Sequence, residues 1–71
     1  MKTISAKELA NELECESVEQ LFDTLIAIKN DNKIAAEGYF KHLKKDSQKQ
    51  FLKYIDEFAD MDDYNFFHQY L

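Results

Sequence analysis

The chain has 71 residues, which suits one small domain, and a formal net charge of −5 from 14 acidic residues against 9 basic ones, all lysines. A single cysteine excludes an internal disulfide framework and a cysteine-rich zinc site. No apolar run approaches the roughly 18 residues that a membrane span needs, and no secretory signal follows the first methionine. We therefore expect residues 1–71 to form one soluble domain in the cytoplasm.

The backbone pattern predicts an all-α fold, a compact bundle of four to five short helices. The chain has no proline, one glycine and none of the Asn-Gly or Asp-Gly pairs that favour β-hairpins. Ser5 and Glu8 have the spacing of a capping box, and Ser17 and Gln20 repeat it. Together with the apolar periodicity, these signals predict helices over about 6–14, 18–29, 33–45 and 48–60, and a last short helix from about 62 onwards.

The same pattern predicts two further helix caps and the residues of a single hydrophobic core. Asp46 and Ser47 read as the turn and cap before the fourth helix, and Asp62 and Asp63 as the cap of the last. Large apolar residues recur at helical spacing in every segment. We expect the core to include Leu9, Leu13, Leu21, Phe22, Leu25, Tyr39, Phe40, Leu43, Phe51, Ile55 and Phe58.

Charge is distributed in three blocks along the chain. Residues 1–32 carry 3 lysines and 7 acids, residues 33–53 carry 6 lysines and 2 acids, and residues 54–71 carry 5 acids and no base. Two interpretations stay open. Either the helices place the lysine block beside the acidic blocks and the charges cancel within the fold, or an acidic block forms a docking surface for a basic partner.

The first two predicted helices have the outline of a helix-turn-helix, so a transcriptional regulator that binds DNA is the alternative function. Three features oppose it. Glu14 stands where the turn usually has glycine, and the apolar residue expected in the second helix falls one place late, at Leu21. The second helix would present Glu19, Gln20 and Asp23, and carboxylates there would repel phosphates.

The remaining function classes have little support. The lysine block lacks the arginine fork that reads guanine or holds a phosphate at two points, so direct nucleic-acid binding is not expected. Cys15, His42 and His68 form no catalytic motif, and no glycine-rich phosphate loop exists, so we expect no enzyme and no cofactor. The acidic run from Asp60 lacks the glycine and the final glutamate of a calcium loop, and we expect no metal site.

Binding to another protein remains, and we expect a small acidic regulator or inhibitor. A compact acidic domain can occupy the basic groove of a nucleic-acid-processing protein by imitating phosphate charge, as anti-defence proteins of mobile elements do. Carboxylates would steer the encounter and aromatic rings would anchor it, while a homodimer through the last rings stays an alternative. The candidate residues are the acidic row Glu12, Glu16, Glu19 and Asp23, the acidic end Asp60, Asp62 and Asp63, and the exposed parts of Phe66, Phe67 and Tyr70.

Overall fold

Four of the five described helices begin at a polar side chain that accepts a hydrogen bond from an early backbone amide. In the computed structural model, which describes residues 3–70, the Ser5 side chain accepts a hydrogen bond from the Glu8 amide and the complete capping box is present. Ser17 accepts from the Gln20 amide in the same way, and Asn32 accepts from the Ala35 amide. The described helices are α1 (Ala6–Glu12), α2 (Val18–Asp31), α3 (Lys33–His42), α4 (Lys45–Phe58) and α5 (Met61–His68). The all-α prediction is confirmed.

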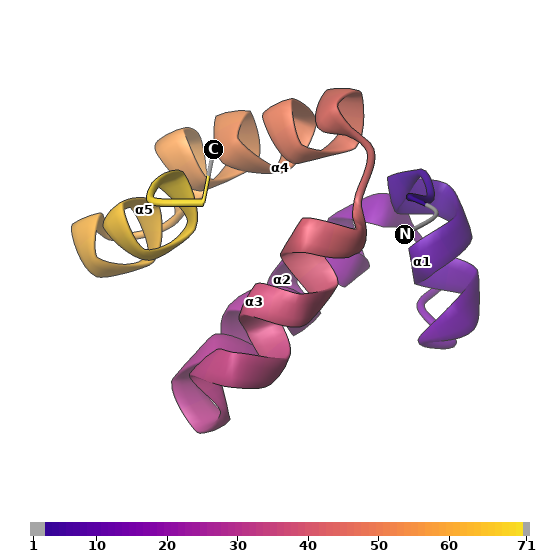
Figure 1. Cartoon of the computed structure of the whole chain (residues 1–71), viewed down its shortest axis with the longest axis horizontal. Coiled ribbons are helices and arrows are strands. Elements are labelled where there is room, and N and C mark those ends of the chain that lie inside the picture. Colours follow the sequence, from indigo (N-terminus) through magenta and orange to yellow (C-terminus); the bar gives the residue numbers. More distant parts are fainter. Residues whose placement is uncertain (1–2, 71) are drawn as a thin grey trace.

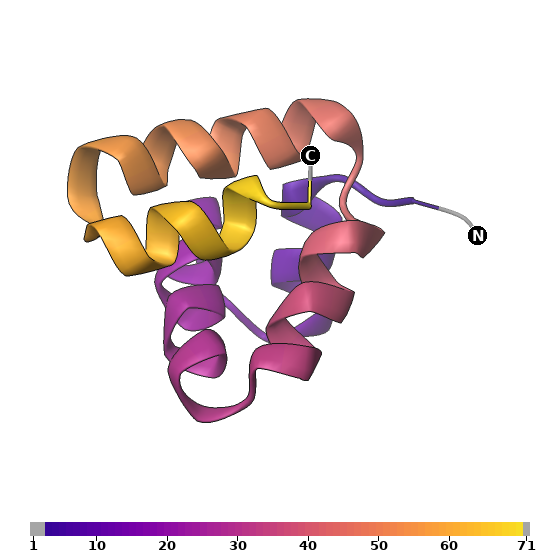
Figure 2. The ribbon, with the colours of Figure 1, turned by 60° about the vertical axis from the view of Figure 1, so that its left-hand side comes forward.

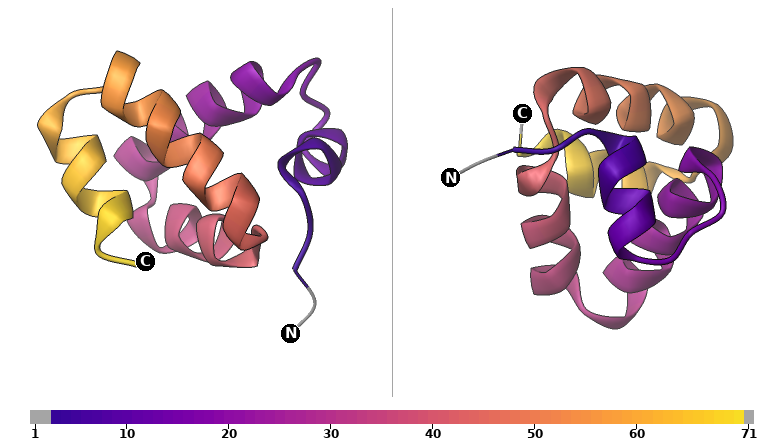
Figure 3. Two further views of the ribbon diagram at one scale, coloured as in Figure 1. Left: turned by 90° about the horizontal axis from the view of Figure 1, so that it is seen from above. Right: turned by 90° about the vertical axis from the view of Figure 1, so that its right-hand side faces the viewer.

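The helices form two hairpins with α1 at one side. α2 and α3 are joined through Asn32 and pack against each other, and α1 packs against α2 (Figure 1). α4 and α5 form the second hairpin, which lies across the end of the first that is remote from the α2–α3 turn (Figure 2). Seen from above, α4 runs across both α2 and α3 (Figure 3).

The segment before α1 is fixed by the connection between α3 and α4. The Ile4 amide donates to the His42 carbonyl at 3.0 Å, and the Lys44 amide donates to the Ile4 carbonyl at 2.8 Å. These bonds form a single parallel bridge between Ile4 and Leu43. The start of the chain is therefore attached to the junction of the two hairpins.

One cluster of buried apolar residues joins all five helices. Phe51 lies at its centre, with its ring centroid 5.0 Å from that of Phe22, 5.7 Å from Phe40 and 4.7 Å from Phe67. Such ring pairs stabilise a core beyond the area that they bury. The buried apolar residues are Ala6, Leu9, Ala10, Leu21, Phe22, Leu25, Ala36, Phe40, Leu43, Phe51, Leu52, Ile55 and Phe67.

Three core predictions need correction. The prediction that Phe58 belongs to the core is wrong, because Phe58 occupies the last turn of α4 and is 72% exposed. Leu13 and Tyr39 are only half-buried and pack on the edge of the core. The other eight predicted residues are buried. Phe58 follows Ile55 at helical spacing, so the periodicity alone could not show that the core stops one turn earlier.

Two predicted caps are wrong as well. α4 begins at Lys45, so Ser47 lies within its first turn, where its buried hydroxyl accepts a hydrogen bond from the Ala6 amide at 2.8 Å. Asp60, and not Asp62 or Asp63, caps α5, because its carboxylate accepts from the Asp63 amide at 3.0 Å. At α5 a neighbouring carboxylate supplies the same chemistry, whereas α4 has no side-chain cap and the Ser47 hydroxyl is engaged by the Ala6 amide.

Candidate functional site

The ten candidate residues divide by their exposure. Six carboxylates lie on the surface, two rings are half-buried, and one carboxylate and one ring are buried. The exposed residues are Glu12, Glu16, Glu19, Asp23, Asp60 and Asp62, the half-buried ones are Phe66 and Tyr70, and the buried ones are Asp63 and Phe67.

Phe67 cannot contact a partner in this fold. Its side chain is fully buried, with the ring centroid 5.4 Å from Phe40 and 4.7 Å from Phe51. Phe66 covers it edge-on from the outside at 4.9 Å, and Tyr70 packs on Phe66 at 5.4 Å. The prediction of an exposed part of Phe67 is therefore wrong, since α5 directs this residue into the core and leaves Phe66 and Tyr70 at its edge.

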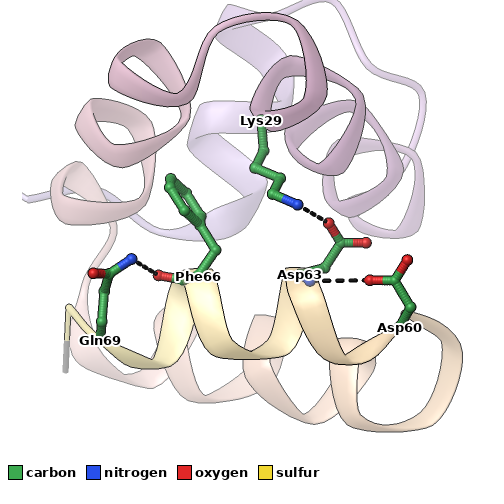
Figure 4. Close-up of polar contacts among 5 residues, drawn as sticks. All are labelled: Lys29, Asp60, Asp63, Phe66 and Gln69. Atoms are coloured by element: carbon green, nitrogen blue, oxygen red, sulfur yellow. Dashed lines mark hydrogen bonds and ion pairs between the residues drawn. The ribbon is translucent and has the colours of Figure 1, made fainter.

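Asp63 is also unavailable, because it forms a buried ion pair. The Lys29 Nζ of α2 lies 2.8 Å from the Asp63 carboxylate, and each side chain is only 9% exposed (Figure 4). The same ammonium lies 5.9 Å from the centre of the Phe66 ring. Asp63 thus holds α5 against α2 instead of facing a partner. Sequence reasoning missed Lys29, although its spacing from Phe22 and Leu25 places it on the buried face of α2.

A hollow between α2 and α4, which we call the acidic groove, brings one of the predicted acids, Glu19, together with residues that the sequence did not indicate. It has a volume of about 580 Å³ and lies between the first turns of α2 and the second half of α4. Its lining is apolar at the base and charged at the rim. The lining residues are Ser17, Val18, Glu19, Phe22, Gln50, Lys53, Tyr54, Glu57 and Phe58.

Tyr54 connects the two sides of the acidic groove. Its hydroxyl donates a hydrogen bond of 2.5 Å to the Asp23 carboxylate, and its ring lies 5.2 Å from Phe22 and 5.0 Å from Phe58. The hydrogen bond to Asp23 raises the pKa of Tyr54 to about 12, with smaller contributions from desolvation and from the charges of Asp23 and Glu19. Tyr54 therefore keeps its proton at neutral pH and holds Asp23 at the edge of the groove.

The exposed ring of Phe58 stands among acidic side chains. Glu19 and Glu57 line the acidic groove beside it, and Lys53 is the one basic residue of the lining. Met61, three residues after Phe58 and at the start of α5, is 67% exposed. An exposed apolar ring in a groove that carboxylates also line is complementary to a ligand that combines an apolar side chain with positive charges.

The other predicted acids do not join this site. Glu12 lies in the last turn of α1, and Asp62 lines a separate hollow at the start of α5 together with Lys29, Lys33 and Phe66. Neither Glu12 nor Asp62 lines the acidic groove. The groove combines Glu19, and Asp23 through its hydrogen bond with Tyr54, with Glu57 and Phe58 of α4.

Ion pairs do not cancel the charge blocks within the fold. In the part of the chain that the structure describes, the two ion pairs are Lys29–Asp63 and Lys41–Glu37, both at 2.8 Å. Lys29 lies outside the lysine block of residues 33–53, and Lys41 pairs within it. The contacts thus give no support to the interpretation in which that block neutralises the acidic ones.

Two of the side chains considered for catalysis, Cys15 and His68, have structural partners. Cys15 Sγ lies 3.8 Å from the Leu13 carbonyl and 3.8 Å from the Thr24 hydroxyl. The His68 ring stacks on Tyr64 with centroids 3.8 Å apart. Across residues 3–70, no three side chains of histidine, cysteine, aspartate or glutamate come together as metal ligands.

Comparisons with known proteins do not assign the chain to a family. No family model matches it, and no curated protein or solved structure does so either. None of the helices formed by residues 3–70 combines the length and apolar character that crossing a membrane requires.

Proposed function

We propose that this protein is a small acidic regulator or inhibitor that binds a basic segment of another protein in the acidic groove. The observation that carries the proposal is the exposed Phe58 ring in a groove that Glu19 and Glu57 also line. A partner with a basic groove or helix, such as a nucleic-acid-processing protein, has the complementary charge. Binding there would block the surface that the partner offers to phosphates.

The two kinds of side chain have different roles in this proposal. The carboxylates of Glu19, Asp23 and Glu57 attract and orient a basic partner, an effect that weakens as salt is added. Phe58 supplies the anchor, because a few aromatic rings that move from water into packed contacts contribute most of the binding free energy of an interface. Tyr54 keeps the ring in place from below, with the two centroids 5.0 Å apart.

One observation favours the alternative of a helix-turn-helix regulator. Glu14 has a φ of 58°, so the turn between α1 and α2 has the left-handed residue for which such turns use glycine. The exposed side of α2, however, presents Glu19, Gln20 and Asp23, which repel a phosphate backbone. A gel shift with random duplex DNA at low salt separates the functions, since clear retention would favour the DNA-binding alternative.

Affinity capture with matched variants tests the proposed function. The immobilised protein is mixed with lysate at low salt, and each retained protein is then purified and its affinity measured. We expect Phe58→Ala to weaken binding of the true partner by about tenfold or more, a typical loss for an interface anchor. Ile34→Ala is the control, because Ile34 is 81% exposed but lies at the start of α3, outside the groove.

A second pair of variants tests the charge. Glu19→Gln with Glu57→Gln removes two carboxylates from the acidic groove, and we expect slower association and a weaker salt dependence. Glu8→Gln with Glu12→Gln makes the same charge change on α1 and should leave the affinity nearly unchanged. The proposal fails if the retained protein has no basic surface, or if the groove variants bind it as tightly as their controls.

A further inference from the structure

A second cavity lies at the junction of the two hairpins, and its charge is opposite to that of the acidic groove. It has a volume of about 580 Å³, and three lysines and two hydroxyl-bearing side chains contribute to its wall. The lining residues are Thr3, Lys41, Leu43, Lys45, Gln48, Lys49 and Tyr70. Among residues 3–70, no acidic residue belongs to this lining.

The fold, and not the sequence order alone, brings these lysines together. Lys45 and Lys49 are one turn apart on the same side of α4, and Lys41 comes from the last turn of α3. Lys33 and Lys53, which belong to the same charge block, line other hollows. Half of the lysines between residues 33 and 53 thus converge on one cavity.

Two neighbours contact the ammonium group of Lys41, which lines the cavity. Its Nζ lies 2.8 Å from the Glu37 carboxylate and 5.2 Å from the centre of the Tyr70 ring. The hydrogen bond and the charge of Glu37 raise the pKa of Lys41, so it is cationic at neutral pH. Glu37 and Asp46, in the first turn of α4, are the acids nearest in sequence to these lysines, and neither lines the cavity.

This arrangement opposes two rules of helix stability. Lysines in the first turn of a helix lie at the positive end of the helix dipole, and like charges one turn apart repel each other. α4 begins with Lys44 and Lys45, and no side chain caps it. Departures from local preference of this kind concentrate at functional sites, where a ligand offsets them.

We propose that this cavity binds an oligophosphate, either free or as the phosphate chain of a nucleotide. Lysine ammonium groups bind phosphate oxygens as point charges, and three of them at one cavity match a ligand with several negative charges. The Thr3 and Tyr70 hydroxyls add neutral donors at the wall. The volume suits a ligand of this size, since small-molecule sites occupy about 300–1,000 Å³. The site is independent of the acidic groove and of the function proposed for it.

Titration calorimetry with sodium triphosphate at low salt tests the site, with ATP and AMP as further arms. We expect binding of triphosphate and ATP, and weaker binding of AMP, which has one phosphate. Equal affinity for triphosphate and ATP means that the phosphates alone are recognised, and tighter binding of ATP means that the nucleoside contributes. Lys45→Gln with Lys49→Gln should weaken binding by about tenfold or more, because two of the three ammonium groups are removed.

The matched control is Lys33→Gln with Lys53→Gln, which removes the same charge outside the cavity. We expect it to change the affinity by less than about threefold, the effect of net charge alone. Equal weakening by the two double variants would overturn the proposal, because it would indicate unspecific attraction. The absence of binding by the wild type, or tighter binding of duplex DNA than of triphosphate, would overturn it too. Circular dichroism confirms that each variant is folded.

Discussion

At the scale of single residues, Lys29 and Asp63 form a buried ion pair that attaches α5 to α2. They are 34 positions apart in the sequence, and both side chains are almost completely buried. A buried charge is tolerated when its partner is present, and removal of one partner leaves the other charge without compensation. The pair therefore makes the placement of α5 sensitive to a single substitution.

We predict that Asp63→Ala lowers the free energy of unfolding by about 3–5 kcal/mol, because Lys29 then remains buried without a counter-charge. For a domain of this size, that is a large part of the total stability. Urea unfolding followed by circular dichroism measures the loss. The control Asp62→Ala removes an exposed acid from the same turn of α5 and should change stability by about 0.5 kcal/mol or less.

Replacement of the whole pair distinguishes a buried charge from lost packing. Lys29→Met combined with Asp63→Leu leaves no charge in the site, and we expect it to recover most of the stability lost in Asp63→Ala. A double variant as unstable as the single one would show that the unpaired ammonium is not the cause.

Tyr54 gives a prediction about pH. The unfolded chain ionises its tyrosines near pH 10, whereas the hydrogen bond to Asp23 raises the pKa of Tyr54 to about 12 in the fold. Below about pH 10 both states hold the proton and the bond contributes fully to stability. Between about 10 and 12 the unfolded state loses its proton first, so this contribution falls as the pH rises.

Ultraviolet absorbance during an alkaline titration measures the ionisation of Tyr54. We expect one of the chain's 4 tyrosines to ionise near pH 12 in the native protein. Asp23→Asn should move this step toward pH 10, because the acceptor is no longer charged. Asp56→Asn, on the same helix as Tyr54 but outside the acidic groove, should leave it in place. An identical titration curve for the wild type and Asp23→Asn would contradict the prediction.

At the scale of elements, the end of α1 has a geometry that its sequence opposes. The Cys15 amide donates to the Ala10 carbonyl at 2.8 Å and the Glu14 amide to the Asn11 carbonyl at 3.2 Å, the two bonds of a Schellman motif. Glu14 takes the left-handed position, with φ at 58°, where glycine is usual. α1 consequently ends two residues before the predicted position 14.

We predict that Glu14→Gly raises the free energy of unfolding by up to about 1 kcal/mol. The left-handed conformation costs an L-residue about 1–2 kcal/mol, and the greater freedom of glycine in the unfolded chain cancels part of this gain. The midpoint of urea unfolding should rise with an unchanged slope. The control Glu12→Gly, at a helical position of α1, should lower it. A lower midpoint for Glu14→Gly would show that the motif carries no strain.

At the scale of the whole molecule, α5 completes the core. Phe67 lies between Phe40 of α3 and Phe51 of α4, so the last helix supplies a ring to the centre of the fold. The core residues of the five helices form one cluster. We therefore expect the chain to unfold as one unit.

Truncation tests this cooperativity. We predict that residues 1–59, which lack α5, show no cooperative unfolding transition, because Phe40 and Phe51 become exposed and Lys29 loses Asp63. Removal of residues 69–71 alone should preserve the transition, since it leaves α5 intact. A sharp urea transition for residues 1–59 would show that the first four helices fold by themselves.

The sequence by itself determined the all-α class and the location of most helices. Those features depend on neighbouring residues: the capping boxes at Ser5 and Ser17 and the apolar spacing that buries Leu21 and Phe51 are local signals. Local patterns also predicted that the surface is rich in exposed carboxylates.

Only the tertiary structure decided which polar and aromatic residues face inward. Lys29 and Ser47 are buried because partners from distant segments, Asp63 and the Ala6 amide, satisfy them, and Phe58 is exposed because the core ends before it. The acidic groove and the lysine cavity each combine residues from separate helices. No spacing along the chain encodes them, since they arise where the second hairpin crosses the first.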